Sequence, residues 1–448
     1  MKTVLIFAHE CAPYNRQAST IGAQRPAQFA KYLPGAGWRA IVICCDAKHA
    51  RTAKKEDLPR IIDNAIQLIT NADPTKSVIV PVPSLIYSGL IDRAWYSLIK
   101  TNTDGSIAGK GRLSSIIRKP FTFLKLFTGD YSESWQPTAM AVASKIHEQV
   151  NVDVCIAEHG PDASLFLARS FSKKYKVPWI TDFRDPILRG FNGLKKYIYK
   201  KYSRHLLTTA KATISVNSYL QTLDEAHFNL PGYTITNGYD KEEFENIATE
   251  KNGKFIISYF GSYGSSQDID LFLRGFKSFI DSVDSDDKHS IVFSYTGLKH
   301  KDINQRASKY SIESNVETKD YVPRHEALKK MLQSDILLLL AFAPYLVTEL
   351  YFKEGVQPGK VFEYMACKRP VLSIPKDNGM LDKLITYTNI GINLSDELEI
   401  SSYLLRSFYN WKKGLPVLYE PNIDKTRLYT RESLALQLAN ILNGYVLA

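Results

Sequence analysis

Short runs of apolar residues alternate with amphipathic stretches along the first half of the chain. The apolar runs have the length of strands, and the stretches between them, such as the one around Gln24 to Leu33, have helical spacing. The expected strands are TVLIFA (3–8), AIVICCD (40–46), VDVCIAE (152–158), VPWITDF (177–183) and ATISVN (212–217). Continuous apolar strands joined by helices are typical of a parallel sheet that is covered on both faces.

The same alternation starts again after a polar segment, ENIATEKNGK (245–254), which we interpret as a linker. The second set of expected strands covers 255–261, 290–297, 316–322, 335–342 and 370–375. We therefore predict an α/β fold with two Rossmann-like, doubly wound domains, 1–244 and 245–425. In such sheets ligands bind beyond the carboxyl ends of the strands, so a ligand shared by both domains is expected in the cleft between them.

Composition adds a charge constraint to this picture. The 448 residues carry a net charge of +11, which favours an anionic partner: nucleic acid, a phosphorylated ligand or an acidic membrane surface. The five cysteines have no metal-binding spacing and suit a reducing cytoplasm. No apolar run reaches the roughly 18 to 20 residues of a membrane span, and the apolar stretch in MKTVLIFA is too short for a signal peptide. We expect a cytoplasmic protein.

Residues 84–127 do not follow the alternation of expected strands and helices. Seven Lys and Arg residues, against Asp92 and Asp104, are interleaved there with Leu, Ile, Phe, Trp and Tyr. This pattern fits a helix pair that lies on an anionic membrane at its inner face. The alternative is two helices that pack on the N-terminal sheet with solvated basic faces.

Several polar residues follow expected strands of the first domain. Gly22 and Arg25 lie at a helix entry beyond the first strand, where Arg25 either binds an anion or caps the surface. His159 follows a strand at the ligand end of the sheet, and it can contact a substrate or cap a helix. Arg184 and Asp185 also end a strand, where they contact a ligand or form a structural pair.

In the second domain, FGSYGSSQDID (260–270) leads from a strand into a helix. Gly261 and Gly264 allow a tight turn and close approach of the backbone to a ligand, and the following helix start suits a phosphate. Asp268 is expected to be the helix N-cap. The acidic run DSVDSDD (281–287) reads as a solvated turn, and we predict no metal site.

The segment GVQPGKVFEYMACKRPVL (355–372) places two charges at the start of an apolar helix. Backbone N–H groups near Gly359, together with Lys360, would favour an anion. The carboxylate of Glu363, one turn further on, can accept hydrogen bonds from two vicinal hydroxyls, as on a ribose. The alternative is an i,i+3 surface ion pair worth only tenths of a kcal/mol.

Together IGAQR, FRDP, TNGYD and GKVFEYMACKRPVL resemble the retaining glycosyltransferases of family 4, which have the GT-B fold. The resemblance implies that Glu363 binds the ribose of a nucleotide sugar and that the turn Gly261–Tyr263–Gly264 approaches the diphosphate. It also implies that the backbone at Tyr321 and Val322 meets the base. The first domain would bind the acceptor, and the last helix, about 426–448, would pack back on that domain.

This sequence departs from the family pattern at two positions. Gly355 stands where the family often has a glutamate that contacts the donor sugar, with Glu354 one place away. The basic pair that often follows the glycine turn is also missing, since no Lys or Arg occurs there before Arg274. Lys360 and the helix starts would therefore have to supply the positive field for the diphosphate.

The resemblance implies a hexosyl- or N-acetylhexosaminyl-transferase that uses no cofactor and no metal. The expected donor is a nucleotide sugar, with UDP-sugar favoured and GDP-sugar possible. The expected acceptor is a saccharide or a lipid-linked saccharide, in bacterial surface polysaccharide or glycan biosynthesis. His159 and Asp185 are the candidate catalytic residues, and Gly22, Arg25 and Arg184 the candidate sugar contacts.

Two rival functions remain open at the level of sequence. A nucleotide-sugar 2-epimerase shares the fold but needs no acceptor. A basic nucleic-acid-binding protein would fit the charge, but the sequence has no DNA- or RNA-reading motif, so we expect no nucleic-acid partner.

Overall fold

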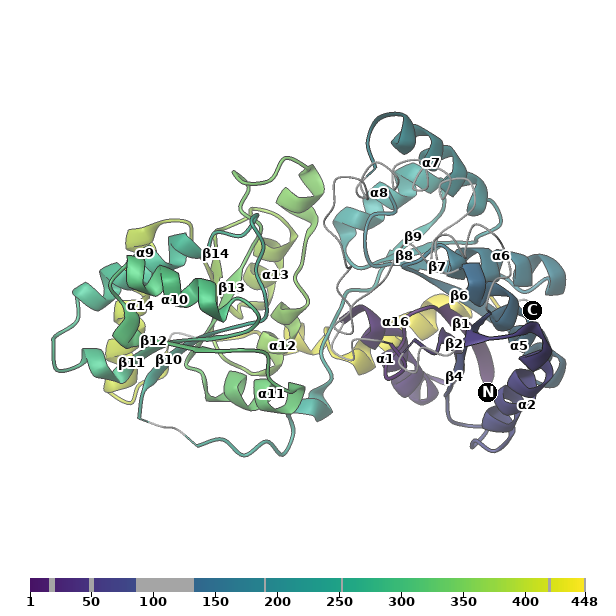
Figure 1. The fold of residues 1–448 in the computed structure, drawn as a ribbon, viewed down its shortest axis with the longest axis horizontal. Helices are drawn as coiled ribbons and strands as arrows, with labels where there is room; N and C mark the ends of the chain where they lie inside the picture. Colours follow the sequence, from purple (N-terminus) through teal and green to yellow (C-terminus); the bar gives the residue numbers. More distant parts are fainter. Residues whose placement is uncertain are drawn as a thin grey trace. The chain divides into compact units, whose positions relative to one another are not determined.

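A computed structural model of the chain describes residues 1–15, 21–47, 52–85, 133–188, 191–250, 253–417 and 420–446. It divides into two compact units, Met1–Ile235 with Ala435–Ala448, and Thr236–Leu434. Each unit is a doubly wound α/β domain built on a parallel sheet, as the sequence predicts (Figure 1). Most of the basic segment 84–127 lies outside the described residues; only Ser84 and Leu85 are described, as a short strand.

The sheet of unit 1 has seven strands in the order β4-β2-β1-β6-β7-β8-β9, and a separate pair joins β3 to β5. The strands are β1 (Lys2–Ala8), β2 (Trp38–Cys45), β3 (Thr52–Ala53), β4 (Val78–Val82), β5 (Ser84–Leu85), β6 (Val154–His159), β7 (Trp179–Phe183), β8 (Thr213–Ser215) and β9 (Gly232–Thr234). Every residue of β2 is buried. A strand can be buried along its whole length only where both faces of the sheet are covered.

Helices provide that cover in unit 1. They are α1 (Ile21–Tyr32), α2 (Leu58–Thr70), α5 (Gln136–Gln149), α6 (Ala163–Tyr175), α7 (Gly193–Leu206) and α8 (Ser218–Phe228), with 3-10 turns at Leu33–Ala36, Lys55–Asp57 and Glu133–Trp135. Apolar side chains of α5 and α6, including Val142 and Phe171, share one core with Leu5 and Phe7 of β1. Most of α16 (Arg431–Asn443) also belongs to this unit.

The sheet of unit 2 has six parallel strands in the order β12-β11-β10-β13-β14-β15. The strands are β10 (Phe255–Phe260), β11 (Ile291–Thr296), β12 (Val316–Lys319), β13 (Ile336–Leu340), β14 (Val371–Ile374) and β15 (Gly391–Asn393). Its helices are α9 (Ile269–Asp281), α10 (His300–Lys309), α11 (Arg324–Gln333), α12 (Lys360–Ala366), α13 (Met380–Thr388), α14 (Glu397–Lys412) and α15 (Ile423–Arg427). Short turns lie at Lys241–Phe244, Lys288–Ser290, Glu313–Asn315 and Tyr351–Gly355.

Two apolar cores lie on the two faces of this second sheet. One joins Phe272 and Phe276 of α9 to Phe293 of β11. The other joins Val361 and Phe362 of α12 to strand residues such as Leu337 and Leu339. The core on the α12 side fixes the helix that carries Lys360 and Glu363.

The units divide at Ile235/Thr236, nine residues before the boundary expected at 244/245. The segment TNGYD belongs with unit 2 because its backbone pairs with the chain near residue 430. Tyr239 N–H donates to the carbonyl of Tyr429 (3.0 Å), and Arg431 N–H donates to the carbonyl of Tyr239 (2.8 Å). A Cβ on Gly238 would lie 2.2 Å from that same Tyr429 oxygen, so this close approach requires glycine.

Candidate functional site

The strand order of unit 2 reverses between β10 and β13, which are neighbours in its sheet. Crevices at such switch points, beyond the carboxyl ends of the strands, are where open α/β sheets bind ligands. The turn after β10 spans this point. Gln267 Nε2 donates to the carbonyl of Leu340 (2.7 Å), and Ala343 N–H donates to the carbonyl of Ser266 (2.8 Å). The predicted glycine turn therefore lies at the expected ligand position of unit 2.

Lys360 lies directly against this turn. Gly261 has φ +100°, a conformation that favours glycine, and a Cβ there would lie 3.3 Å from Lys360 Nζ. The ammonium donates to Tyr259 Oη (2.9 Å) and lies 4.2 Å from the centre of the Tyr259 ring. Burial lowers the pKa of Lys360 to about 8, although the nearby Glu363 carboxylate opposes the shift.

Three tyrosines stabilise the turn through hydrogen bonds and ring contacts. Tyr259 Oη donates to the carbonyl of Ser262 (2.9 Å), and Tyr295 Oη donates to the carbonyl of Gly261 (2.8 Å). The rings of Tyr259 and Tyr295 are stacked with their centres 5.7 Å apart. Burial raises the pKa of both hydroxyls, so they remain neutral donors. We name Tyr259, Tyr263 and Tyr295 the tyrosine cluster.

A second cation lies on the tyrosine cluster. Lys299 follows β11, and its Nζ is 4.7 Å from the centre of the Tyr263 ring. The Tyr263 hydroxyl donates to Asp302, so this tyrosine faces the protein interior and supports the turn. Gly297 lets the β11 end approach closely, since a Cβ there would lie 2.2 Å from the Gly261 carbonyl oxygen. Lys360 at the start of α12 and Lys299 after β11 thus both lie beside this turn.

Glu363 is not paired with Lys360 in the manner of a surface i,i+3 pair. Its Oε1 accepts from Arg324 Nη1 (2.7 Å), and the carboxylate is 17% exposed. Arg324 also binds both carboxylate oxygens of Glu243 (3.1 and 2.6 Å). The neighbouring carboxylates raise the pKa of Arg324, although burial opposes that shift. Arg324 therefore holds the Glu363 carboxylate in one orientation.

Four backbone N–H groups in the glycine turn and at the start of α12 are already engaged within the protein. Gly261 N–H donates to Thr296 O (2.8 Å), and Gly264 N–H donates to Gln267 Oε1 (2.9 Å). After Gly359, the N–H groups of Val361 and Phe362 donate to the carbonyls of Pro358 (3.0 Å) and Gly359 (3.2 Å). The positive charge beside the turn thus comes from lysine side chains more than from these amides.

The remaining predicted residues of unit 2 differ in exposure. Tyr321 and Val322 follow β12 at the same edge of the sheet; Tyr321 is 61% exposed and Val322 is buried. Gly355 is buried at the end of the short turn that contains Glu354, whose side chain is exposed. Asp268 is the N-cap of α9, as expected, and accepts from Leu271 N–H (3.0 Å).

Unit 1 has its own switch point between β1 and β6. Arg184 reaches across the strand ends there and forms an ion pair with the buried Glu158. The guanidinium fits against two glycines, since a Cβ on Gly22 or Gly160 would lie 1.3 or 2.5 Å from its nitrogens. Burial raises the pKa of Glu158 to about 8, although Arg184 opposes the shift. Arg184 thus forms an ion pair with Glu158, and the charge of the neighbouring Asp185 also acts on it.

Arg25 differs from the expectation of a surface or ligand-facing cation. Its side chain is fully buried, and its guanidinium binds the two oxygens of Asp182 at 2.7 and 2.8 Å. It also donates to the carbonyl of Ile235 (2.9 Å). Because two charges and their donors are satisfied inside unit 1, Arg25 holds α1 against β7.

His159 lies at the end of β6 and is held by a hydrogen bond between Nε2 and Asp162 Oδ1 (2.9 Å). Asp162 also accepts from the Tyr199 hydroxyl (2.6 Å). This links the histidine to the start of α6 and to α7. Asp185 is exposed beyond β7, where its charge helps raise the pKa of Arg184.

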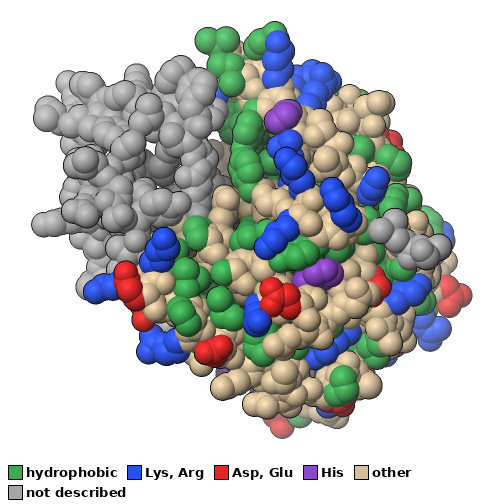
Figure 2. Space-filling model, turned by 90° about the vertical axis from the view of Figure 1, so that its right-hand side faces the viewer, with side chains coloured by type: hydrophobic (Ala, Val, Ile, Leu, Met, Phe, Trp, Pro, Cys, Tyr) green, Lys and Arg blue, Asp and Glu red, His purple; other side chains and the backbone are tan. Residues whose placement is uncertain are grey.

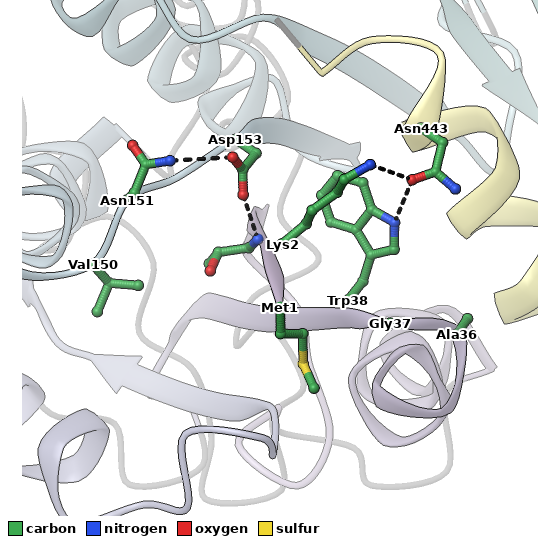
Figure 3. A pocket seen from close by; sticks show the side chains of 10 residues that line it. Met1, Lys2, Ala36, Gly37, Trp38, Val150, Asn151, Asp153 and Asn443 are labelled. Carbon is green, nitrogen blue, oxygen red and sulfur yellow. Dashed lines mark hydrogen bonds between the residues drawn. The ribbon is translucent and has the colours of Figure 1, made fainter. Parts of the chain in front are cut away.

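A groove of about 630 Å³ opens at the opposite, amino-terminal edge of the unit 1 sheet (Figure 3). Its polar groups bond to each other. Asn443 Oδ1 accepts from Lys2 Nζ (3.0 Å) and Trp38 Nε1 (3.2 Å), while Asp153 accepts from Thr3 N–H (2.6 Å). We assign this groove to the attachment of α16 to the sheet.

No group of three or more His, Cys, Asp and Glu side chains that could hold a metal ion occurs among the described residues. None of the helices in those same ranges is both long and apolar enough to cross a membrane.

Sequence reasoning missed four residues of these two sites. Arg324 acts through Glu363 of α12, Lys299 and Tyr295 act through the turn after β10, and Glu158 acts through Arg184. The signal for Lys299 and Glu158 was their place directly after, or at the end of, a parallel strand. Arg324 had no such signal, because its partners lie far away in sequence.

Comparison with known proteins finds similarity in structure alone. No protein-family model matches the chain, and no curated protein matches its sequence. The solved structures it resembles include the N-terminal domain of trehalose-6-phosphate phosphatase from Candida albicans (TM-score 0.59, 12% identity, 100% of this chain and 97% of that one). Another is HepE from Anabaena in complex with UDP-glucose (TM-score 0.54, 12% identity, 99% of this chain and 100% of that one).

A third is WaaG, a glycosyltransferase involved in lipopolysaccharide biosynthesis (TM-score 0.52, 11% identity, 98% of this chain and 100% of that one). Each likeness covers nearly all of both chains, so it concerns both units. At such low identity it establishes the fold and not the reaction. With two parallel-sheet α/β domains of this topology, the chain has the GT-B fold.

Proposed function

We propose that this protein is a retaining glycosyltransferase of the family 4 type that uses a nucleotide-diphosphate sugar. The observation that carries the proposal is the switch point of unit 2, where a glycine turn after β10 meets α12, the helix that carries Lys360 and an oriented Glu363. The structural neighbour HepE was solved with UDP-glucose, which supports a UDP-sugar as donor.

In this proposal Glu363 accepts hydrogen bonds from the two ribose hydroxyls. Arg324 already occupies Oε1 and so fixes the plane of the carboxylate. Fixed orientation matters because the side chain then loses little freedom when the ribose binds. The exposed Tyr321 and the backbone beside the buried Val322 are assigned to the base.

The diphosphate lies against the glycine turn, between Lys360 and Lys299. As the bond between the anomeric carbon and the phosphate oxygen breaks, its electron pair passes to the diphosphate, and the two ammonium groups stabilise that charge. The acceptor oxygen attacks the same face of the sugar and gives its proton to the leaving phosphate. The anomeric configuration is then retained without an enzymic nucleophile, and we propose that no metal is needed.

Unit 1 is assigned to the acceptor, with His159 and Asp185 beside the strand ends and Arg184 held between Gly22 and Gly160. We propose a saccharide acceptor attached to a lipid, in the synthesis of a bacterial surface polysaccharide. The neighbour WaaG, which is named for lipopolysaccharide biosynthesis, supports this choice. The protein would then work in the cytoplasm at the inner membrane face.

A thermal-shift screen against UDP-, GDP- and ADP-sugars tests the nucleotide part directly, because a ligand that binds only the folded state raises its stability. We expect a UDP-sugar to give the largest shift. Glu363→Ala should remove most of that shift. Glu397→Ala is the matched control, because it removes a carboxylate from an ion pair with Arg274 elsewhere in unit 2. An equal shift in Glu363→Ala and the wild type would refute the ribose assignment.

Product analysis tests the reaction itself. Incubation with the preferred donor and a lipid-linked saccharide should give a glycoside with the anomeric configuration of the donor, measured by NMR. A changed donor sugar in the absence of any acceptor would show an epimerase instead.

A further inference from the structure

Helix α7 (Gly193–Leu206) carries an unusual concentration of positive charge. Its sequence, GLKKYIYKKYSRHL, contains four lysines and one arginine and no acidic residue. The deficit extends beyond the helix, since no Asp or Glu occurs from 186 to 223. Helices that are merely solvated commonly place acids three or four residues from such cations. In α7 no acidic residue lies three or four positions from any of these cations.

The exposed side of α7 also carries large apolar side chains. Tyr199, Ser203 and Leu206 face the protein interior. Leu194 and Tyr197, on the other side, are 69% and 56% exposed. They are three residues apart, so they lie on one face, and Lys201 continues that face one turn later.

The cations of α7 are arranged around these apolar groups. Lys201 Nζ lies 4.6 Å from the centre of the Tyr197 ring, and Lys195 Nζ lies 4.6 Å from that of Phe191. Lys196 and Lys200 are exposed beside them. Among the described residues, no carboxylate forms an ion pair with a cation of α7. The view of unit 1 in Figure 2 has Lys and Arg side chains gathered in its upper part, the height at which α7 lies in Figure 1.

We propose that α7 docks unit 1 on an anionic phospholipid surface. Lysines attract the headgroups of acidic lipids, while exposed leucine and tyrosine side chains enter the boundary between headgroups and acyl chains. A free phosphate or a nucleic acid backbone would use the lysines but would gain nothing from Leu194. The combination of both side-chain classes on one face therefore selects a bilayer as the partner.

This surface is independent of the nucleotide site, and its test needs no sugar transfer. Sedimentation with vesicles of phosphatidylcholine containing about 30% phosphatidylglycerol, at about 0.1 M salt, measures the partition of the full-length protein. Each lysine near an acidic bilayer contributes on the order of a fivefold change in partition. Replacing Lys196, Lys200 and Lys201 with Gln should lower it on the order of a hundredfold.

The matched control replaces Lys301, Lys309 and Lys329 of unit 2 with Gln, which changes the net charge by the same amount. Those three lysines are exposed, and the control should retain most of the binding. Equal losses in the two triple variants would mean that net charge alone acts, and would overturn the proposal. Undiminished binding by the α7 variant would overturn it as well, because another segment would then make the contact.

A second variant separates a bilayer from other polyanions. Leu194→Ser with Tyr197→Ser should weaken vesicle binding several-fold and leave binding to a fluorescent single-stranded oligonucleotide unchanged. If the α7 lysine variant loses oligonucleotide binding but keeps vesicle binding, the surface is a nucleic-acid site and the proposal fails. Circular dichroism of each variant checks that it is folded.

Discussion

If the proposed donor binds beside Lys360, the lowered pKa of this lysine should make donor binding depend on pH near neutrality. Burial brings this pKa from its usual 10.5 to about 8. The diphosphate of a nucleotide sugar attracts the ammonium form and not the neutral amine. If only the protonated form binds tightly, the affinity falls as the pH rises through 8.

The size of the effect follows from the fraction of Lys360 that is protonated. With a pKa of about 8, about 97% is protonated at about pH 6.5 and about 24% at about pH 8.5. The dissociation constant for the donor should therefore rise about fourfold over this range, which corresponds to about 0.8 kcal/mol. Both phosphates of a nucleotide sugar are esterified, so the ligand keeps its charge over these pH values.

The same shift predicts how stability changes with pH. The folded state holds fewer protons than the unfolded chain between about pH 8 and 10.5. The contribution of Lys360 to the free energy of unfolding therefore increases as the pH rises through that window. Below the window, the full cost of burying the charged ammonium is present. Binding and stability thus move in opposite directions with pH.

Isothermal titration calorimetry with the donor found in the thermal-shift screen measures the fourfold change. Lys360→Met should bind weakly at every pH, with no slope. Lys360→Arg should also lack the slope, because the guanidinium stays charged. A wild-type affinity that is constant from about pH 6.5 to 8.5, or a Lys360→Met variant that keeps the wild-type slope, would refute this reasoning.

Three further predictions concern other charged residues. Lys299→Ala should weaken donor binding about tenfold by calorimetry, since a charge-assisted contact to the diphosphate is lost; Lys301→Ala, two residues further along, should bind as the wild type does. Arg324→Met should lower the affinity for the donor although Glu363 is still present. Arg324→Lys should restore only part of that affinity, because lysine cannot bridge Glu243 and Glu363 with a planar fork. Wild-type affinity in Arg324→Met would show that Glu363 needs no positioning. Arg25→Met should destabilise unit 1 by about 3–5 kcal/mol in urea unfolding, because Asp182 is left buried without its partner; a loss below about 1 kcal/mol would show that water reaches Asp182.

The sequence indicated the long central strands because most of their residues are buried and apolar, although β6 and β7 also carry the buried Glu158 and Asp182. It did not indicate β4, where Pro81 interrupts the run, or the short edge strands β9 and β15. Edge strands are half-buried, so their side chains follow no strict apolar pattern. The boundary between the units was displaced because the pairing of Tyr239 with Tyr429 joins residues far apart in sequence.

The residues of the candidate site were predictable where a sequence motif coincides with a tight turn or a helix start. Gly261, Lys360 and Glu363 belong to such segments, and the structure brings Gly261 and Lys360 into contact. The partners of those residues were not predictable. The contacts of Arg324 with Glu363 and of the buried Arg25 with Asp182 join elements that are far apart in sequence, and they depend on the order of the strands in each sheet.

Two lysines that lie over the tyrosine cluster stand in for the basic pair that is missing after the glycine turn. Coulomb attraction depends on distance and on the surrounding medium, not on the order of residues in the chain. Lys360 is the first residue of α12, and Lys299 lies in the loop after β11. Both ammonium groups lie over rings of the cluster, at 4.2 and 4.7 Å from the ring centres. Because the ring hydroxyls also hold the carbonyls of Gly261 and Ser262, one cluster fixes both the turn and its cations. The position of the diphosphate in unit 2 should therefore depend on Tyr259 and Tyr295 as much as on the lysines.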